Sequence, residues 1–235
     1  MNYGYGYGYG YGSDMSYIIL CVVTFVIGLA AQAYINSTYN KWSKVPASGG
    51  RSGAEMARSM LQVFGANSVG IGKVRGHLTD NYNPATNVLS LSEENFSGGS
   101  VASVAVACHE AGHAVQTAKG YLPGKIRTAI VPVVSISQSI WGLAFMAGIM
   151  MNAIGLVRFA IILFAFSVIF QLVTLPVEID ASRRAIEYLG EYGSAQDMQG
   201  ARQVLTAAAL TYVAAAMTSV LQLLYLVGQT NRRSR

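Results

Sequence analysis

Ser100-Val-Ala-Ser-Val-Ala-Val-Ala-Cys-His-Glu-Ala-Gly-His-Ala-Val-Gln-Thr117 is the stretch of sequence that decides the fold. Its Ala and Val residues surround the helical axis almost completely, which is typical of a helix that other elements bury. The stretch contains His109-Glu110-Ala111-Gly112-His113, an H-E-x-x-H pattern. Positions four apart share one face of a helix, so both imidazoles can hold one zinc ion while Glu110 faces the open position of the metal. The stretch therefore predicts a buried helix that carries a metal site.

The residue types of this pattern fit peptide hydrolysis. Glu110 can take a proton from a zinc-bound water as the water attacks a peptide carbonyl, and can return the proton to the leaving amine. Two of the three histidines of the chain lie in this buried stretch, where unpaired imidazoles would be costly. The pattern therefore predicts a zinc metallopeptidase with His109 and His113 as metal ligands and Glu110 as the catalytic base.

A catalytic zinc site needs a third protein ligand. The acidic residues downstream are Glu178, Asp180, Glu187, Glu191 and Asp197. Glu178 is the first choice, because it follows directly on an apolar stretch that ends near Pro176 and lies on the same membrane face as the motif. Asp180 is the second choice. An alternative for Glu178 is a carboxylate in the first turn of a helix, stabilised there by the helix macrodipole or paired with Arg183 or Arg184.

The remaining histidine, His77, follows a predicted strand. It is a candidate for a catalytic contact with the transition state, since an oxyanion donor must stand beside the metal. A surface histidine in a polar loop is the alternative. Tyr82 is a similar candidate, whereas Cys108 is expected to be a small buried residue and not a thiolate ligand.

The composition indicates a membrane protein. Of the 235 residues, 52% are hydrophobic and only 11% are charged, against about 25% charged residues in soluble domains. Four apolar stretches reach the length of roughly 20 residues that a bilayer-spanning helix needs. They are residues 16–35, 129–151, 154–175 and 204–228. The predicted fold class is therefore a mainly α, polytopic membrane protein with four transmembrane helices and a zincin-like (gluzincin) catalytic domain.

Two segments remain for the catalytic domain. Residues 36–128 form a catalytic loop domain that carries the motif helix, and residues 176–203 contain a helix with the third zinc ligand. In this second segment Pro176 is expected to end the membrane helix and to begin a new one over Val177–Leu189. The ends of the chain are a Tyr-Gly tail over residues 1–15, expected to be disordered, and a basic tail over residues 229–235.

Within the catalytic loop domain, Gly53–Phe64 has the apolar spacing of a helix. Residues 69–74 and 87–91 alternate as strands do, and the turn-rich run Thr79–Pro84 joins them. The sequence therefore predicts a small β-hairpin, which could receive an extended substrate by strand addition.

The distribution of charge bears on topology and on partners. The two loop segments carry twelve of the sixteen Lys and Arg residues, so the positive-inside rule places the catalytic side in the cytoplasm, although the basic tail favours the opposite orientation. No nucleic-acid signature or nucleotide-binding pattern accompanies these charges. The expected partners are a protein or peptide substrate and the lipid bilayer, with no nucleic acid and no nucleotide, and the oligomeric state does not follow from the sequence.

Three motifs resemble a known family. The motifs are His77-Leu-Thr-Asp80, the run from Val104 to Gln116 and the run from Leu175 to Ala185, and they are similar to the bacterial membrane family called putative neutral zinc metallopeptidases, or YugP-like proteins. The resemblance covers about Met56 to the C-terminus and implies proteolysis of membrane or misfolded proteins, with zinc as cofactor. Asn81 and Asn83 stand where the family pattern is expected to have His and Asp.

More distantly, the layout resembles the HtpX-type membrane proteases, whose third zinc ligand is the first residue of an E-x-x-A-D motif. When this motif is aligned with Glu178-Ile-Asp-Ala-Ser182, the resemblance implies that Glu178 is the third ligand. Ser182 replaces the final Asp of the motif, and Asp180 could supply the missing carboxylate.

Two alternatives to a membrane-anchored zinc metalloendopeptidase stay open. The first is an intramembrane zinc protease that cuts inside the bilayer. The polar residues of the H-E-x-x-H stretch, however, make this stretch a poor transmembrane segment. The second is a non-catalytic metal-binding scaffold or a metal transporter. A transporter would be expected to have acidic residues in its spans, and the four apolar stretches contain none.

Overall fold

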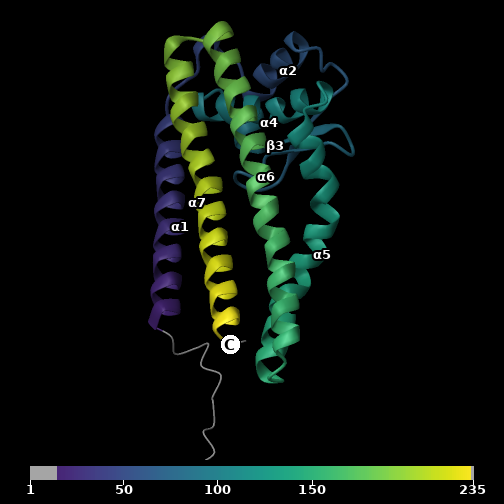
Figure 1. The fold of residues 1–235 in the computed structure, drawn as a ribbon. Helices are drawn as coiled ribbons and strands as arrows, with labels where there is room; N and C mark the ends of the chain where they lie inside the picture. The colour runs from purple at the N-terminus through teal and green to yellow at the C-terminus, as the bar shows by residue number, and fades with distance from the viewer. Residues whose placement is uncertain (1–14, 234–235) are drawn as a thin grey trace, which may run out of the picture. The chain divides into compact units, whose positions relative to one another are not determined.

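The computed structural model describes residues 15–233, which form seven α-helices, one short 3-10 helix and three strands (Figure 1). Almost all of the predicted Tyr-Gly tail and the last two residues of the basic tail lie outside the described residues. The chain divides into two compact units. We call residues 15–29, 130–172 and 214–233 the apolar unit, and residues 30–129 and 173–213 the mixed unit.

Segments of four long helices build the apolar unit: α1 (Met15–Trp42), α5 (Leu122–Met150), α6 (Ile154–Tyr192) and α7 (Ala195–Arg233). Its core is small, with Val157, Phe164 and Leu226 among the buried side chains. Other large apolar side chains face outward, as do Phe25 and Leu143, which are 66% and 74% exposed. Such surfaces are unfavourable in water and suit lipid. All four helices are long and apolar enough to cross a membrane, which confirms the predicted fold class.

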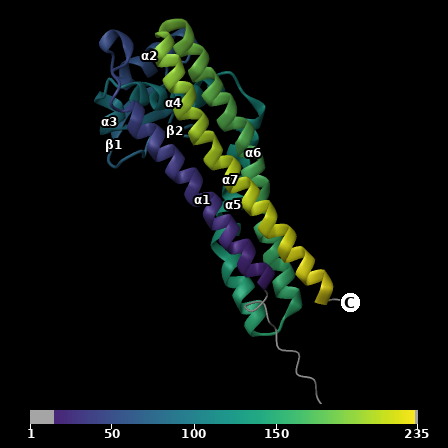
Figure 2. The same ribbon diagram turned by 90° about the vertical axis from the view of Figure 1, so that its left-hand side faces the viewer.

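Helix α4 (Val101–Ala118) lies at the centre of the mixed unit. Its N-terminus is capped by Ser100, whose Oγ accepts a hydrogen bond from the backbone N–H of Ser103 at 3.1 Å. Twelve of its 18 residues are buried, which confirms the predicted buried helix. Helix α2 (Gly53–Val63), helix α3 (Glu93–Ser97) and the sheet pack around it (Figures 1 and 2).

Helix α2 follows the short 3-10 helix η1 (Ser48–Gly50) and confirms the helix predicted over Gly53–Phe64. It begins with a capping box: Glu55 N–H donates to the Ser52 hydroxyl, and Ser52 N–H donates to the Glu55 carboxylate at 2.7 Å. The buried residues of the helix include Met56, Ala57, Met60 and Leu61, a spacing that gives one apolar face. This face packs against α4.

The sheet contains β1 (Gly70–Val74), β2 (Asn81–Asn83) and β3 (Val88–Ser92) in the order β1-β3-β2. The two predicted strands form, but the hairpin predicted between them is wrong, because β1 and β3 run parallel. The run predicted as a turn contains β2, which pairs antiparallel with β3 and makes the hairpin instead. The chain reverses twice between β1 and β3. Gly76 and Leu78 adopt positive φ angles of 116° and 53° in the first reversal, before β2, and Asn87 adopts a φ of 54° in the second, directly before β3.

Helix α6 runs unbroken through Pro176, so the helix end predicted there is wrong. A proline removes one backbone donor, but neighbouring side chains can keep such a turn helical. Pro176 leaves the carbonyl of Leu172 without its helical donor. The next turn is tied to the rest of the mixed unit, because the Tyr121 hydroxyl donates to the carbonyl of Pro176 at 3.4 Å and Gln116 Nε2 donates to the carbonyl of Val177 at 2.8 Å. The predicted segment 176–203 is consequently divided between the end of α6 and the start of α7.

Helices α4 and α6 come very close at Gly112. A Cβ atom on Gly112 would lie 2.7 Å from the carbonyl oxygen of Ala181 and 3.2 Å from its Cα. Ala181 is itself fully buried, so the two backbones meet with almost no side chain between them. Since Gly112 lies between His109 and His113, this contact sets how near α6 comes to both histidines.

We predict that Gly112→Ala destabilises the protein. Alanine favours a helix by about 1 kcal/mol over glycine, but the new methyl group meets a backbone carbonyl that no side-chain rotation can move, and overpacking costs about 1–3 kcal/mol. The midpoint of thermal unfolding of the purified full-length chain in detergent should fall. Gly142→Ala is the matched control, because Gly142 also lies inside a helix, α5, and a Cβ there would meet nothing within 4 Å. Equal midpoints for the two variants would refute the close-contact argument.

Candidate metal centre

The structure brings His109 and His113 of α4 together with Glu178 of α6. Glu178 Oε2 lies 3.3 Å from His109 Nε2 and 3.4 Å from His113 Nε2. The side chains of both histidines are 12% exposed and that of Glu178 is 3% exposed. One ligand atom from each residue lies within 4.8 Å of the other two, and in the part of the chain that the structure describes no other group of three His, Cys, Asp or Glu residues converges in this way.

The spacing of these atoms fits a zinc ion. Zinc bonds of about 2.0–2.2 Å in a tetrahedral arrangement separate neighbouring ligand atoms by about 3.3–3.6 Å, which matches the two distances to Glu178 Oε2. Glu178 Oε2 is also buried and accepts no hydrogen bond from the described residues, a costly state for a carboxylate oxygen without a cation. Two imidazole nitrogens and one carboxylate oxygen form a three-ligand set that leaves a fourth position for a reactant.

The electrostatic field at the cluster attracts positive charge. Burial disfavours the imidazolium form of His113, but the contact with Glu178 and the negative charges of Glu110 and Glu178 outweigh burial and raise the pKa of His113. The same negative charges favour a divalent cation between the side chains.

Gln116 orients the imidazole of His113. The amide nitrogen of Gln116 donates to the carbonyl of Val177 at 2.8 Å and to Asp180 Oδ2 at 2.9 Å, and both of these atoms can only accept. The amide oxygen therefore faces His113 Nδ1, at 3.1 Å. Nδ1 must then carry the proton, which leaves the lone pair of Nε2 directed toward Glu178.

Asp180 supports the site and does not belong to the cluster of ligand atoms. Its carboxylate binds Arg183 at 2.5 Å and Arg184 at 2.6 Å, in addition to Gln116. The other imidazole has a separate support, since Ser182 Oγ lies 3.1 Å from His109 Nδ1. Ser182, at the position where the HtpX-type motif has an Asp, thus contacts His109 directly, while Asp180 contacts His113 only through Gln116.

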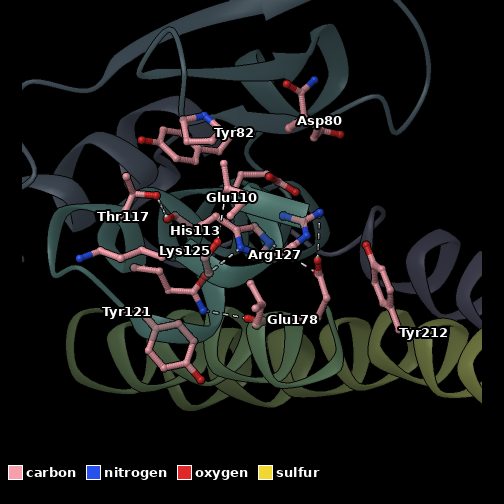
Figure 3. A pocket seen from close by; sticks show the side chains of 17 residues that line it. Asp80, Tyr82, Glu110, His113, Thr117, Tyr121, Lys125, Arg127, Glu178 and Tyr212 are labelled. Carbon is pink, nitrogen blue, oxygen red and sulfur yellow. Dashed lines mark hydrogen bonds and ion pairs between the residues drawn. The ribbon is translucent and has the colours of Figure 1, made fainter. Parts of the chain in front are cut away.

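Glu110 lies on the wall of a cavity of about 470 Å³ together with His113 and Glu178 (Figure 3). Its carboxylate makes no hydrogen bond or ion pair with another described residue, so it can accept a proton from a molecule in the cavity. Asp80 is a further acidic residue of the wall, but it accepts hydrogen bonds from Ser92 N–H and Asn95 Nδ2, each at 2.8 Å. Asp80 therefore anchors the start of β2, and Glu110 is the carboxylate that remains available.

His77 neither belongs to the cluster of ligand atoms nor lines the cavity. Its Nδ1 lies 2.5 Å from the carboxylate of Glu94, and its side chain is 64% exposed. A catalytic role for His77 stays a prediction without a contact at the site. Tyr82 does line the cavity, and its hydroxyl donates to Asn87 at 2.9 Å. Cys108 is fully buried, as predicted, and burial raises the pKa of its thiol.

Sequence reasoning missed three residues of the site: Gln116, Arg127 and Tyr212. Gln116 could have been found, because it lies one helical turn after His113 on the same face. Arg127, near the start of α5, and Tyr212, in α7, also line the cavity. No pattern in the sequence connects them to the motif, since only the packing of separate helices brings them there.

One protein family matches nearly the whole chain. The family model described as "Putative neutral zinc metallopeptidase" matches residues 17–231. The chain belongs to this zinc metallopeptidase family. The family assignment confirms the resemblance that the motifs predicted and extends it to the first apolar stretch, and it confirms zinc as the cofactor.

A relative in Bacillus subtilis (strain 168) is described as "Putative membrane protease YugP". It is 41% identical to this chain over 215 residues, which are 91% of this chain and 96% of the relative. No solved structure matches the chain.

We predict that Glu178 and Asp180 differ in their effect on zinc. Glu178→Ala removes a proposed ligand, and the purified protein should lose its stoichiometric zinc. Asp180→Ala removes the support of Gln116 and the partner of Arg183 and Arg184, but no proposed ligand, so the zinc affinity should fall about 10–100-fold. Competition with a chromophoric chelator measures both effects. Glu187→Ala is the control, because this carboxylate lies on the same helix with its side chain 65% exposed. Asp180→Ala losing zinc as completely as Glu178→Ala would contradict the assignment.

Proposed function

We propose that this chain is a membrane-anchored zinc metalloendopeptidase in which His109, His113 and Glu178 hold the zinc ion and Glu110 is the catalytic base. One observation carries the proposal: two imidazole nitrogens lie 3.3 and 3.4 Å from one buried carboxylate oxygen, beside a cavity that Glu110 also lines. Membership of a zinc metallopeptidase family supports the same reading. The four apolar helices support anchoring in the membrane.

The residues of the site account for the chemistry of peptide hydrolysis. Zinc bound at the cluster would polarise the peptide carbonyl and make a water molecule more acidic. The Glu110 carboxylate accepts a proton from the water as the water oxygen bonds to the carbonyl carbon, and the π electron pair moves to the carbonyl oxygen. The electron pair on the oxygen then re-forms the carbonyl double bond as the carbon–nitrogen bond breaks, and the electron pair of the broken bond stays on the nitrogen, which takes the proton back from Glu110. Each peptide bond thereby consumes one water.

The edge strand β2 provides a place for the substrate backbone. It pairs with β3 on one side only, and its residues Asn81 and Tyr82 line the cavity. An extended peptide can add to such an edge by main-chain hydrogen bonds. This mode requires an unfolded segment, so we propose that the substrates are membrane proteins or misfolded proteins with an exposed extended stretch.

The catalytic side is proposed to face the cytoplasm. Residues 36–128 and 176–203 carry twelve of the sixteen Lys and Arg residues of the chain. Positively charged loops favour the cytoplasmic side of a membrane.

The direct test of the function is Glu110→Gln. The amide cannot take a proton from water, and loss of a general base lowers the rate about 10²–10⁴-fold. Hydrolysis of casein by the zinc-loaded protein in detergent should fall accordingly, with the zinc content unchanged. A Glu110→Gln variant that cleaves as fast as wild type would defeat the proposal. Zinc uptake into proteoliposomes without any peptidase activity would favour a transporter instead.

A second prediction concerns the edge strand. A peptide paired with β2 directs alternate backbone amides toward that strand. Methylation of single amide nitrogens along a cleaved peptide should therefore weaken its binding about tenfold at every second position, the approximate effect of one lost hydrogen bond that leaves an acceptor unpaired. Inhibition constants of the methylated peptides measure this. A uniform effect along the peptide would argue against strand addition.

A further inference from the structure

The proposed hydrolysis places negative charge on the carbonyl oxygen of the substrate. Donors fixed near that oxygen commonly contribute a large part of the rate enhancement. His77, which the sequence suggests for this role, lies outside the cavity beside Glu94. A donor to this oxygen must therefore come from another residue that lines the cavity.

Arg127 lines the same cavity as Glu110, His113 and Glu178 (Figure 3). One of its terminal nitrogens lies 3.9 Å from Glu178 Oε1, which is longer than a hydrogen bond. Its Nε is buried and has no hydrogen-bond partner among the described residues. A buried guanidinium N–H without an acceptor is costly. The side chain as a whole is 38% exposed and makes no hydrogen bond with another described residue, so its terminal nitrogens can donate to a molecule in the cavity.

The other donors beside the cluster are already engaged. The Tyr121 hydroxyl donates to the carbonyl of Pro176, and the Gln116 amide donates to Val177 and Asp180. Lys125 is an exposed cation at the cavity, and a strongly hydrated ammonium is a weaker donor there than a partly buried guanidinium. The Tyr212 hydroxyl, which also lines the cavity, is an uncharged alternative donor.

We propose that Arg127 is a catalytic residue that donates hydrogen bonds to the carbonyl oxygen of the scissile peptide bond. The inference rests on the proposed function of the site. A guanidinium is always charged, so its attraction for the carbonyl oxygen grows as the π electron pair moves onto that oxygen. The interaction is therefore stronger in the transition state than with the bound substrate, and it raises kcat with little effect on KM.

The test compares Arg127→Met and Arg127→Lys with wild type, as full-length, zinc-loaded protein in detergent. For Arg127→Met we expect kcat on a quenched fluorescent peptide to fall about 10²–10³-fold, with KM changed less than threefold. The affinity for an N-phosphoryl dipeptide, a tetrahedral anion, should fall by the same factor as kcat/KM. Zinc affinity should stay at the wild-type value. Arg127→Lys keeps the charge and should recover part of both losses.

Arg58→Met is the matched control, because Arg58 is an exposed arginine on α2 outside the cavity, and it should behave as wild type. If Arg127→Met lost zinc affinity to the same extent as activity, the inference would be overturned, and Arg127 would be a positioning residue for Glu178. Unchanged kcat and inhibitor affinity would overturn it as well, and the same losses in Tyr212→Phe would then assign the role to Tyr212.

Failure of the proposed function gives a different result. Wild-type protein that binds zinc but hydrolyses peptides no faster than Glu110→Gln would overturn the proposed function and this inference with it. Wild-type activity that depends on Glu110 but not on Arg127 would overturn this inference alone.

Discussion

The close approach of two helices at Gly112 is the constraint on which the site depends. The motif places two imidazoles on one face of α4, but the third proposed ligand comes from α6, so the backbones must nearly touch before Glu178 can reach both rings. The absence of a side chain at Gly112 and the small, buried Ala181 opposite it allow this contact. The hydrogen bond from Gln116 to the carbonyl of Val177 then fixes α6 at the residue directly before Glu178.

Buried polar groups around the site follow a consistent pattern. The carboxylate of Asp180 is neutralised by two arginines and Gln116, and the carboxylate of Asp80 is held by Ser92 and Asn95. Such satisfied groups stabilise one arrangement of the chain. By contrast, Glu178 Oε2 and Arg127 Nε are buried without a hydrogen-bond partner, and both residues line the cavity. These two unsatisfied groups therefore belong to residues that lie where an ion and a substrate would bind, whereas the unsatisfied hydroxyls of Ser167, Thr174 and Tyr188 lie outside the cavity.

Much of this arrangement could be predicted from the sequence. The four apolar stretches and the buried motif helix follow from length and periodicity alone, and Glu178 followed from its position after an apolar stretch on the same side of the membrane. The wrong predictions at Pro176 and in the sheet have a common cause, which is the packing of elements that are separate in the sequence. Pro176 stays inside a helix whose next turn receives hydrogen bonds from Tyr121 and from Gln116 of α4, and β1 pairs in parallel because the chain forms β2 between β1 and β3 and so reverses its direction twice. Arg127 was missed for the same reason, since tertiary packing alone brings it to the cavity.

The set of zinc ligands is the central claim, and X-ray absorption at the zinc edge of the loaded, full-length protein tests it most directly. The account predicts two imidazole rings and a carboxylate oxygen, with all nearest scatterers at about 2.0–2.2 Å. A third imidazole, which only His77 could supply, would contradict the account. A sulfur scatterer at about 2.3 Å, which would implicate a cysteine such as Cys108, would contradict it equally.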